Sequence, residues 1–216
     1  MTGIGKPAHY MRAMTAALQP GLFETAPASP DLPPGFAYRP DFLSPGEEGG
    51  LLGWLGTLPF EPFQFRGFEG KRRVISFGWK YDFTRSHLVS ADGIPAELSA
   101  VRERAAAFAG LGAEDLQQCL INEYLPGAPI GWHRDRPAFE TVLGISLKAP
   151  CSFRLRRRVD ERFARAAIEL QPRSIYALTG EVRTAWEHSI PPVKAHRYSI
   201  TFRNFRGETR GLPAAR

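Results

Sequence analysis

The chain is poor in cysteine, in lysine and in long apolar segments, and each shortage excludes a class of protein. Its 216 residues include only two cysteines, Cys119 and Cys151, too few for a cysteine-rich zinc site or a disulfide framework. Both stand in apolar contexts, so we interpret them as buried thiols. No apolar run approaches the roughly 20 residues that a membrane-spanning helix needs. The first residues also lack the apolar block of a signal peptide, so we expect a cytoplasmic protein without a membrane partner.

Lysine is scarce but arginine is abundant, and the chain is basic. Lysine accounts for only five of the 28 basic residues, which leaves 28 − 5 = 23 arginines, and the formal net charge is +6. Guanidinium groups bind phosphate in pairs and stack on bases, so this composition favours a nucleic-acid partner. A GC-rich genome, which raises Arg, Ala, Gly and Pro together, explains the same composition equally well. The length fits one domain, and we expect a monomer.

The first half of the sequence predicts an extended arm and two helices. Residues 1–35 are rich in Ala, Pro, Thr and Ser and predict an N-terminal arm, followed by a single domain over 36–216. A capping-box pattern that begins at Ser44 predicts a helix over 45–57. Apolar residues that recur on one stripe predict a second helix over 95–109.

From Gln118 onward the pattern is that of short strands separated by glycine and proline. The predicted strands are 118–125, 141–148, 151–158, 168–171, 173–179, 183–189 and 197–204. The charged, alanine-rich segment Val159–Ala167 reads as a hairpin connection. Many short strands without intervening helices predict an α+β fold that is mainly β, a sandwich or jelly roll with the N-terminal helices packed on one sheet.

The segment His133-Arg134-Asp135, together with the distant His188, carries the strongest chemical signal. Residues i and i+2 of an extended segment point to the same face, so His133 and Asp135 can reach one ion. Two imidazoles and one carboxylate are the ligand set of a facial-triad iron site, which keeps metal positions open. Arg197, on the predicted strand after His188, is well placed to bind a carboxylate. Taken singly, each residue has a plainer explanation as a surface residue, a core histidine or half of a salt bridge.

Five motifs together give the chain a family resemblance. In order they are Asn122-Glu123-Tyr124, Pro126-Gly127, His133-Arg134-Asp135, Trp186-Glu187-His188-Ser189-Ile190-Pro191 and Arg197-Tyr198-Ser199-Ile200-Thr201-Phe202-Arg203. This set resembles the AlkB family of iron(II)- and 2-oxoglutarate-dependent dioxygenases, strongly over 118–206 and more weakly over 66–87. The resemblance is closer to the branch of the tRNA-modifying animal homologue than to the best-known bacterial repair enzyme. It implies a double-stranded β-helix, or jelly roll.

The resemblance also implies cofactors, residue roles and a reaction. The implied iron ligands are His133, Asp135 and His188. The residues implied to bind or support 2-oxoglutarate are Asn122, Tyr124, Arg197, Ser199 and Arg203. Arg197 would bind the distal carboxylate and Arg203 would lie near the metal-bound end, whereas one family pattern has asparagine at the position of Ser199. The implied cofactors are Fe(II), 2-oxoglutarate and dioxygen. The implied reaction is oxidative demethylation of N-alkylated bases in DNA or RNA, with release of succinate, carbon dioxide and formaldehyde.

Substrate contacts are predicted from basic and aromatic residues. Residues 66–87 interleave the two kinds, a mix that suits nucleic acid, and the family region at this place forms a lid over the active site. The candidates there are Arg73, Trp79 and Tyr81, with packing of the aromatic rings on the core as the alternative. Further candidates are Arg134 and Arg136, which flank Asp135, and Glu140. The alternating Arg154, Arg156 and Arg158 predict either a phosphate track or a solvated strand face.

The chain departs from the repair members just after Asp135. Those members carry an acidic residue there that recognises the cationic alkylated base. Here the sequence continues Arg136-Pro137-Ala138-Phe139-Glu140, so only Glu140 is acidic, at a different position. This departure leaves two alternatives open. One is a hydroxylase of a protein side chain, a lipid or a small metabolite, and the other is a non-enzymatic, metal-dependent nucleic-acid-binding protein.

Overall fold

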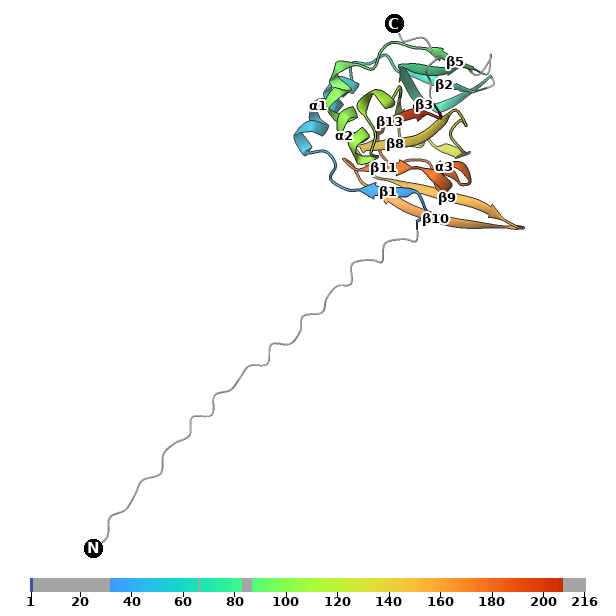
Figure 1. Cartoon of the computed structure of the whole chain (residues 1–216). Coiled ribbons are helices and arrows are strands. Elements are labelled where there is room, and N and C mark those ends of the chain that lie inside the picture. Colours follow the sequence, from blue (N-terminus) through green and yellow to red (C-terminus); the bar gives the residue numbers. More distant parts are fainter. Residues whose placement is uncertain (2–31, 66, 83–86, 208–216) are drawn as a thin grey trace.

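The computed structural model describes residues 1, 32–65, 67–82 and 87–207, which form two antiparallel sheets and a small hairpin (Figure 1). The large sheet has the spatial order β1 (Phe36–Arg39), β11 (Ile175–Leu178), β8 (Phe139–Leu147), β13 (Arg197–Phe205), β6 (Gln118–Tyr124), β3 (Phe68–Phe77) and β2 (Glu61–Phe65). The small sheet has the order β10 (Arg162–Leu170), β9 (Cys151–Val159), β12 (Glu187–Ile190) and β7 (Ile130–His133). The hairpin pairs β4 (Trp79–Asp82) with β5 (His87–Ser90).

Helices cover one face of the large sheet, and the small sheet covers the other. The helical elements are α1 (Pro45–Leu55), η1 (Ala96–Leu98), α2 (Ser99–Phe108), η2 (Ala113–Asp115) and α3 (Gly180–Thr184). Leu55 of α1 and Ala105 of α2 pack with Ile121, Ile145 and Ile200 of the sheet in one buried cluster. The predicted mainly β fold with helices on one sheet is therefore confirmed, and Figure 1 shows α1 and α2 lying together away from β9 and β10.

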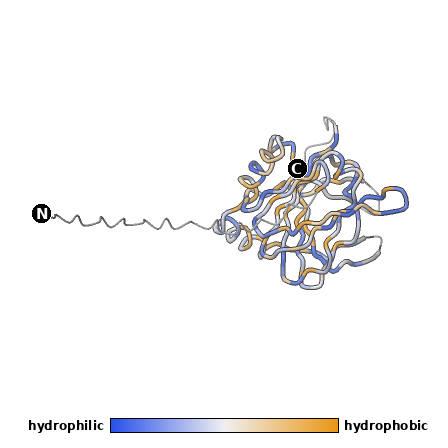
Figure 2. Tube along the Cα trace, turned by 90° about the horizontal axis from the view of Figure 1, so that it is seen from below, coloured by the Kyte–Doolittle hydropathy of each residue, from blue (hydrophilic) through white to orange (hydrophobic). Residues whose placement is uncertain are grey.

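A second apolar cluster fills the space between the two sheets. Tyr124 and Tyr176 of the large sheet meet Phe153, Leu155 and Ile190 of the small one. Apolar stretches run through the interior of the trace, and hydrophilic ones gather in its outer loops (Figure 2). Strand alternation divides the large sheet between the two clusters, because successive side chains point to opposite faces.

The sequence predictions of local structure are confirmed in outline and wrong at two places. The capping box at Ser44 is present, and the two helices form close to their predicted ranges. Residues 180–184 form the short helix α3, so the strand predicted over 183–189 exists only from residue 187. The predicted connection Val159–Ala167 is mostly strand β10, which pairs with β9 along its whole length.

The predicted lid and arm both stay predictions. Within segment 66–87, β3 is a strand of the large sheet between β2 and β6. Only the hairpin β4–β5 stands apart from the sheet, and residues 83–86 at its turn lie outside the described residues. Of the predicted arm, residues 2–31 also lie outside them.

Two predictions, one from the few cysteines and one from the lack of long apolar segments, can also be compared with the structure. Cys119 and Cys151 are both free and buried, as predicted. Across the described ranges, no helix is both long enough and apolar enough to cross a membrane.

Gly144 in β8 makes room for an aromatic side chain between the sheets. It is paired with Tyr176 across β8 and β11, and a Cβ atom at position 144 would lie 2.2 Å from the Tyr176 ring. Tyr176 is buried and contacts Phe153, with the two ring centroids 4.8 Å apart. The glycine therefore fixes where this ring lies in the inter-sheet core.

Substituting Gly144→Ala should destabilise the protein by about 1–3 kcal/mol, because the added methyl group overpacks the core against a ring that cannot withdraw freely. The free energy of unfolding in urea measures the effect. Gly50→Ala in α1 is the matched control, since a Cβ there meets nothing within 4 Å. It should stabilise the helix by roughly 0.5–1 kcal/mol. Equal responses of the two variants would contradict this account of Gly144.

Candidate active site

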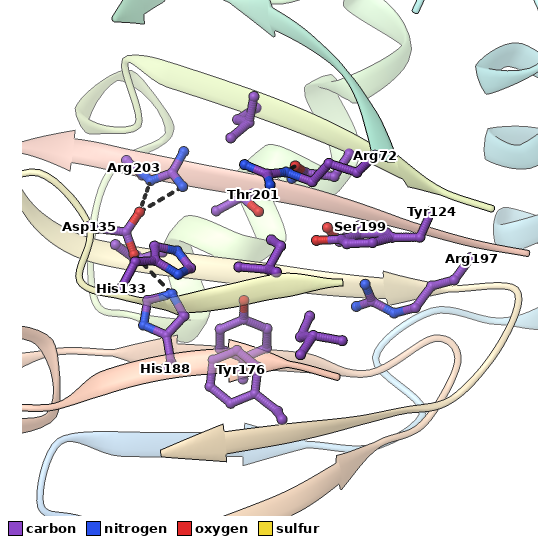
Figure 3. Close-up of a pocket in the computed structure, with 16 residues that line it drawn as sticks. Arg72, Tyr124, His133, Asp135, Tyr176, His188, Arg197, Ser199, Thr201 and Arg203 are labelled. Atoms are coloured by element: carbon purple, nitrogen blue, oxygen red, sulfur yellow. Dashed lines mark hydrogen bonds and ion pairs between the residues drawn. The ribbon is translucent and has the colours of Figure 1, made fainter. Parts of the chain in front are cut away.

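One pocket between the two sheets collects all eight residues that the resemblance implies to bind iron or 2-oxoglutarate. Its lining residues are Arg72, Leu120, Asn122, Tyr124, Ile130, His133, Asp135, Val142, Phe153, Tyr176, His188, Ile190, Arg197, Ser199, Thr201 and Arg203 (Figure 3). Strands β6 and β13 contribute every second residue to it, because their other side chains face the helices.

The two predicted histidine ligands lie side by side on neighbouring strands. His133 ends β7 and is paired directly with His188 of β12, and their ring centroids are 4.2 Å apart. Nδ1 of His133 is 2.9 Å from the carbonyl oxygen of Gly131, so in the tautomer that donates this hydrogen bond Nε2 carries the free lone pair. Asp135 follows β7 and reaches the same point, with Oδ2 3.5 Å from Nε2 of His188.

Asp135 is held by an arginine from the far end of β13. Arg203 donates from Nε to Oδ1 at 2.9 Å, and its Nη2 lies 2.7 Å from the same oxygen. Arg203 also donates from Nη1 to the side-chain oxygen of Gln118 at 2.7 Å. Burial, the largest single cause, would raise the pKa of Asp135, but Arg203 and the smaller contributions of other neighbouring groups together outweigh burial and hold this pKa well below its usual range. Asp135 is therefore a carboxylate throughout the ordinary pH range.

The two histidines are buried as neutral rings. Burial, and next the neighbouring His133, lower the pKa of His188 to about 3. Burial is also the main cause that lowers the pKa of His133. The contact between His188 and Asp135 is therefore not an ion pair near neutral pH. Neutral imidazole and ionised carboxylate are the protonation states that a divalent metal requires of its ligands.

The donor set fits iron in type, and two of its ligand atoms lie near the spacing that one ion requires. Oδ2 of Asp135 is buried and accepts no hydrogen bond, while Oδ1 is used by Arg203. Two ligand atoms that are each about 2.1 Å from one ion, in directions at right angles, lie about 3.0 Å apart. The 3.5 Å between Oδ2 of Asp135 and Nε2 of His188 therefore needs little adjustment. Among the described residues, no three His, Cys, Asp or Glu side chains are already gathered as closely as around a bound ion. Metal binding would therefore draw the triad together.

Arg197 is a buried cation with unpaired hydrogen-bond donors, as a residue that binds a carboxylate requires. Only 1% of it is exposed, and Nη2 donates to the hydroxyl of Ser146 at 3.2 Å. Its Nε and Nη1 are buried and have no hydrogen-bond partner in the described part of the chain. Leaving such donors unsatisfied is costly, so the site fits an anionic ligand such as the distal carboxylate of 2-oxoglutarate.

The other predicted 2-oxoglutarate contacts line the same pocket. Asn122 and Tyr124 of β6 are paired with Ser199 and Arg197 of β13, respectively, so the four form one patch of the sheet. The Arg197 guanidinium lies 4.9 Å from the centre of the Tyr124 ring. Sequence reasoning missed Tyr176, which faces this patch from β11, because nothing in its apolar strand marks it as part of a site.

The two substrate candidates from segment 66–87 whose side chains are described, Arg73 and Trp79, do not line the pocket. Arg73 forms an ion pair with Glu123, and Glu123 also accepts hydrogen bonds from Tyr198 Oη at 3.0 Å and makes a 3.0 Å contact with Nε2 of His196. This network lies on the opposite face of β6 from Asn122 and Tyr124. Trp79 is buried against Phe139 and Phe205, which corresponds to the packing alternative. Tyr81 belongs to β4, but its side chain lies outside the described residues.

The candidates near Asp135 lie around the site without lining it. Arg134 is exposed and donates to the backbone oxygen of Thr184 at 3.3 Å. Arg136 is partly buried, and its carbonyl oxygen accepts a hydrogen bond from Arg183. Glu140 is exposed on β8 and is not among the lining residues. The acidic group that repair members place beside the base is thus not supplied by Glu140.

The pocket lining includes Arg72, a residue that sequence reasoning did not select, in place of the predicted Arg73. Arg72, and not Arg73, lines the pocket, where its Nε donates to Oδ1 of Asn122 at 3.1 Å. The choice depends on which face of β3 each residue occupies. Only the pairing of β3 with β6 defines that face, so no local sequence signal was available.

The alternating arginines of β9 form a patch with aromatic rings on the outer face of the small sheet. Arg156 lies 4.4 Å from the ring centre of Trp132 and 4.7 Å from that of Phe163. Arg154 lies 5.1 Å from the Trp132 ring, and Arg165 lies 5.7 Å from the Phe163 ring. We call these five residues the outer-face patch. Arg158, the third residue of the predicted track, bonds within its own hairpin to the backbone oxygen of Asp160.

Comparison with known proteins gives one family and several relatives. The model of the 2OG-Fe(II) oxygenase superfamily matches residues 62–203. An alkylated DNA repair protein ALKBH8 homolog of Arabidopsis thaliana is 29% identical over 188 residues, which cover 73% of this chain and 51% of that protein. The Xenopus tropicalis tRNA (carboxymethyluridine(34)-5-O)-methyltransferase alkbh8 is 29% identical over 77% of this chain and 26% of its own length. AlkB of Salmonella typhimurium, an alpha-ketoglutarate-dependent dioxygenase, is 32% identical over 51% of this chain and 55% of its own length. The chain thus spans about half or less of these relatives.

Solved structures share the architecture at low sequence identity. The structure of OsALKBH1 has a TM-score of 0.62 and 16% identity, covering 80% of this chain and 98% of that one. A Pseudomonas putida prolyl-4-hydroxylase has a TM-score of 0.56 and 13% identity, covering 80% of this chain and 93% of its own. This likeness confirms the predicted jelly-roll fold.

Chelator-treated protein should lose stability as the pH falls from about 6.5 toward 3. The pKa of His188 is about 3 in the fold, below its ordinary value of 6.5, so between these values the unfolded chain binds a proton that the folded chain does not. His188 therefore lowers the free energy of unfolding by up to about 1.4 kcal/mol for each unit by which the pH falls. Urea unfolding of the wild type and of His188→Gln at several pH values measures the contribution. The difference between the free energies of unfolding of the two proteins should change as the pH falls from about 6.5 toward 3. Free energies that vary in parallel with pH would refute the assignment.

Proposed function

The chain belongs to the 2OG-Fe(II) oxygenase superfamily and is an enzyme of the AlkB type that uses iron(II), 2-oxoglutarate and dioxygen, and on this premise we propose that it oxidises an alkyl group on a base of DNA or RNA. When bound, these cofactors supply the oxidation of an unactivated C–H bond, with succinate and carbon dioxide as co-products. On an N-methyl base the product is an N-hydroxymethyl group. It releases formaldehyde and restores the base.

We assign the site residues by what their free atoms can do. His133, His188 and Oδ2 of Asp135 would hold the metal on one side and leave its other side open to the pocket. Arg203 keeps Asp135 ionised and oriented, as a neighbour behind a metal ligand does. Arg197 would orient 2-oxoglutarate through its unsatisfied donors, and the apolar side chains of Val142, Ile130 and Phe153 would exclude water.

The nucleic-acid part of the proposal is carried by the outer-face patch. Trp132 precedes the ligand His133, and Arg154 and Arg156 lie on both sides of Leu155, which is paired with His188. Guanidinium groups stacked on aromatic rings are the combination that binds phosphate and bases together. A strand of nucleic acid that crossed the edge strand β7 would meet this patch and the site within a few residues.

Relatives support the same substrate class through their names. The Arabidopsis relative is named for repair of alkylated DNA, and the Xenopus relative for a modified uridine of tRNA. The formal net charge of +6 also favours a polyanionic partner.

A screen of methylated DNA and RNA oligonucleotides by mass spectrometry tests the proposal directly. With iron(II), ascorbate, 2-oxoglutarate and air, at least one modified base should be hydroxylated or demethylated, and formaldehyde should appear where the target is an N-methyl group. His133→Ala removes one metal ligand and should abolish the product, while it leaves oligonucleotide binding within about twofold, since the outer-face patch is intact. Formation of succinate without any change to an oligonucleotide, across the whole panel, would refute the proposal.

Arg197→Lys should raise the KM for 2-oxoglutarate roughly 10- to 100-fold and leave kcat at saturating 2-oxoglutarate within a few-fold. The variant keeps the charge but loses the paired donors, and a charged hydrogen bond contributes about 1.5–3 kcal/mol. Initial rates of succinate formation measure both constants. Arg158→Lys on the exposed β9–β10 hairpin is the matched control and should change neither constant. An unaltered KM in Arg197→Lys would show that another group binds the carboxylate.

A further inference from the structure

Arg72 is a third guanidinium in the pocket, and the roles assigned so far leave it unused. It projects from β3, and its Nε donates to Oδ1 of Asn122 at 3.1 Å. Its guanidinium lies 3.6 Å from the centre of the Phe63 ring, which covers one of its faces. Figure 3 shows the side chain extending from β3 toward Thr201 and Arg203. Its charge acts on His133 and on Arg203, so it lies within electrostatic reach of the metal position.

The donors of Arg72 differ from those of the other two arginines. Arg203 uses both sides of its guanidinium on Asp135 and Gln118, so it has little left to offer a ligand. Arg197 points its spare donors at the place assigned to 2-oxoglutarate. Within the described ranges, the only hydrogen bond of Arg72 is made by Nε. Its two terminal nitrogens are therefore available to a molecule in the pocket.

The charge balance of the pocket is positive. Among the described residues that line it, three are arginines and only one, Asp135, is a carboxylate. The charges of iron(II) and of the 2-oxoglutarate dianion cancel each other, so bound cofactors leave this excess unchanged. A cationic group that enters a poorly solvated, positively charged pocket is repelled, whereas an oxygen acceptor gains a charge-assisted hydrogen bond.

We propose that Arg72 forms a subsite for an oxygen acceptor of the substrate, next to the carbon that is oxidised, and that the pocket therefore selects neutral, carbonyl-bearing bases over cationic alkylated bases. This inference rests on the proposed oxidation of bases and specifies the class of base. The charge of Arg72 is opposite to that of the acidic residue that repair members carry, so the expected preference is also opposite. The Phe63 ring and Asn122 hold the guanidinium in position for this contact.

The test uses two oligonucleotides that differ at one position of one base. 3-Methyluracil is neutral and has a carbonyl oxygen at ring position 4, whereas 3-methylcytosine has an amino group there and is cationic near neutral pH. Both carry the same N-methyl group, so the bond to be oxidised is unchanged. Affinity is measured without oxygen, in the presence of iron(II) and 2-oxoglutarate. Demethylation is then measured in air with the same samples.

Wild-type protein should bind and demethylate the 3-methyluracil oligonucleotide roughly tenfold better than the 3-methylcytosine oligonucleotide. The first base gains a charge-assisted hydrogen bond, and it avoids the repulsion that the cationic base meets. Arg72→Glu should reverse this preference, and Arg72→Lys should keep its direction. Lys71→Glu makes the same change of charge on the adjacent exposed residue of β3, and should leave the ratio within about twofold. The KM for 2-oxoglutarate is recorded for each variant, because Arg72 also contacts Asn122.

The outcomes separate this inference from the function on which it rests. Equal affinity of the wild type for the two oligonucleotides would overturn the subsite. So would an unchanged ratio in Arg72→Glu, including the case in which only the KM for 2-oxoglutarate rises and Arg72 merely supports Asn122. Discrimination in binding without oxidation of either base would keep the subsite, and the proposed oxidation would be refuted if the whole panel of methylated oligonucleotides also stayed unchanged. Failure to bind either oligonucleotide would overturn both.

Discussion

The ion pair between Arg203 and Asp135 is the interaction on which the rest of the site depends. Asp135 lies beyond the end of the edge strand β7, so its backbone alone does little to fix its position. Arg203, anchored in the middle of the large sheet and bonded also to Gln118, holds one carboxylate oxygen and leaves the other exposed to the pocket. A buried pair of this kind is costly to desolvate, and it persists here because its geometry is good and its remaining donors are satisfied. Through it, the two sheets share one metal-binding position.

Strand parity is the second constraint, and it explains why a single strand can serve both the core and the chemistry. In β13, Ile200 and Phe202 face the helices, whereas Arg197, Ser199 and Arg203 face the pocket. A shift of the pairing by one residue would exchange the two sets, burying three polar side chains under the helices. The apolar residues therefore hold the polar ones in place, and the hydrophobic core fixes the register of the site.

The metal and co-substrate residues could be predicted because five ordered motifs resemble the AlkB family, and because alternation along an extended segment places members of one motif on the same face. His133 and Asp135, or Asn122 and Tyr124, share a face whatever the rest of the fold does. Arg72 could not be told from Arg73 in this way, since the face of β3 is defined by pairing with β6, about 50 residues away. Tyr176 was missed because its place in the pocket depends on Gly144 of another strand. The helix α3 and the strand β10 were misjudged for a similar reason: tertiary packing, and not local propensity, decided them.

The Glu123 network has a consequence for how the protein folds. Glu123 is bonded to Arg73, His196 and Tyr198, which are 50, 73 and 75 residues away along the chain. Contacts of such long sequence separation require large loops to close before any of their stabilisation is gained, and folds that depend on them form slowly. The strands that carry the pocket therefore assemble late, after the local hairpin β9–β10 and the helices. A nascent chain would leave the facing edges of β6 and β8 unpaired until β13 has been synthesised, and would be most prone to aggregation during that interval.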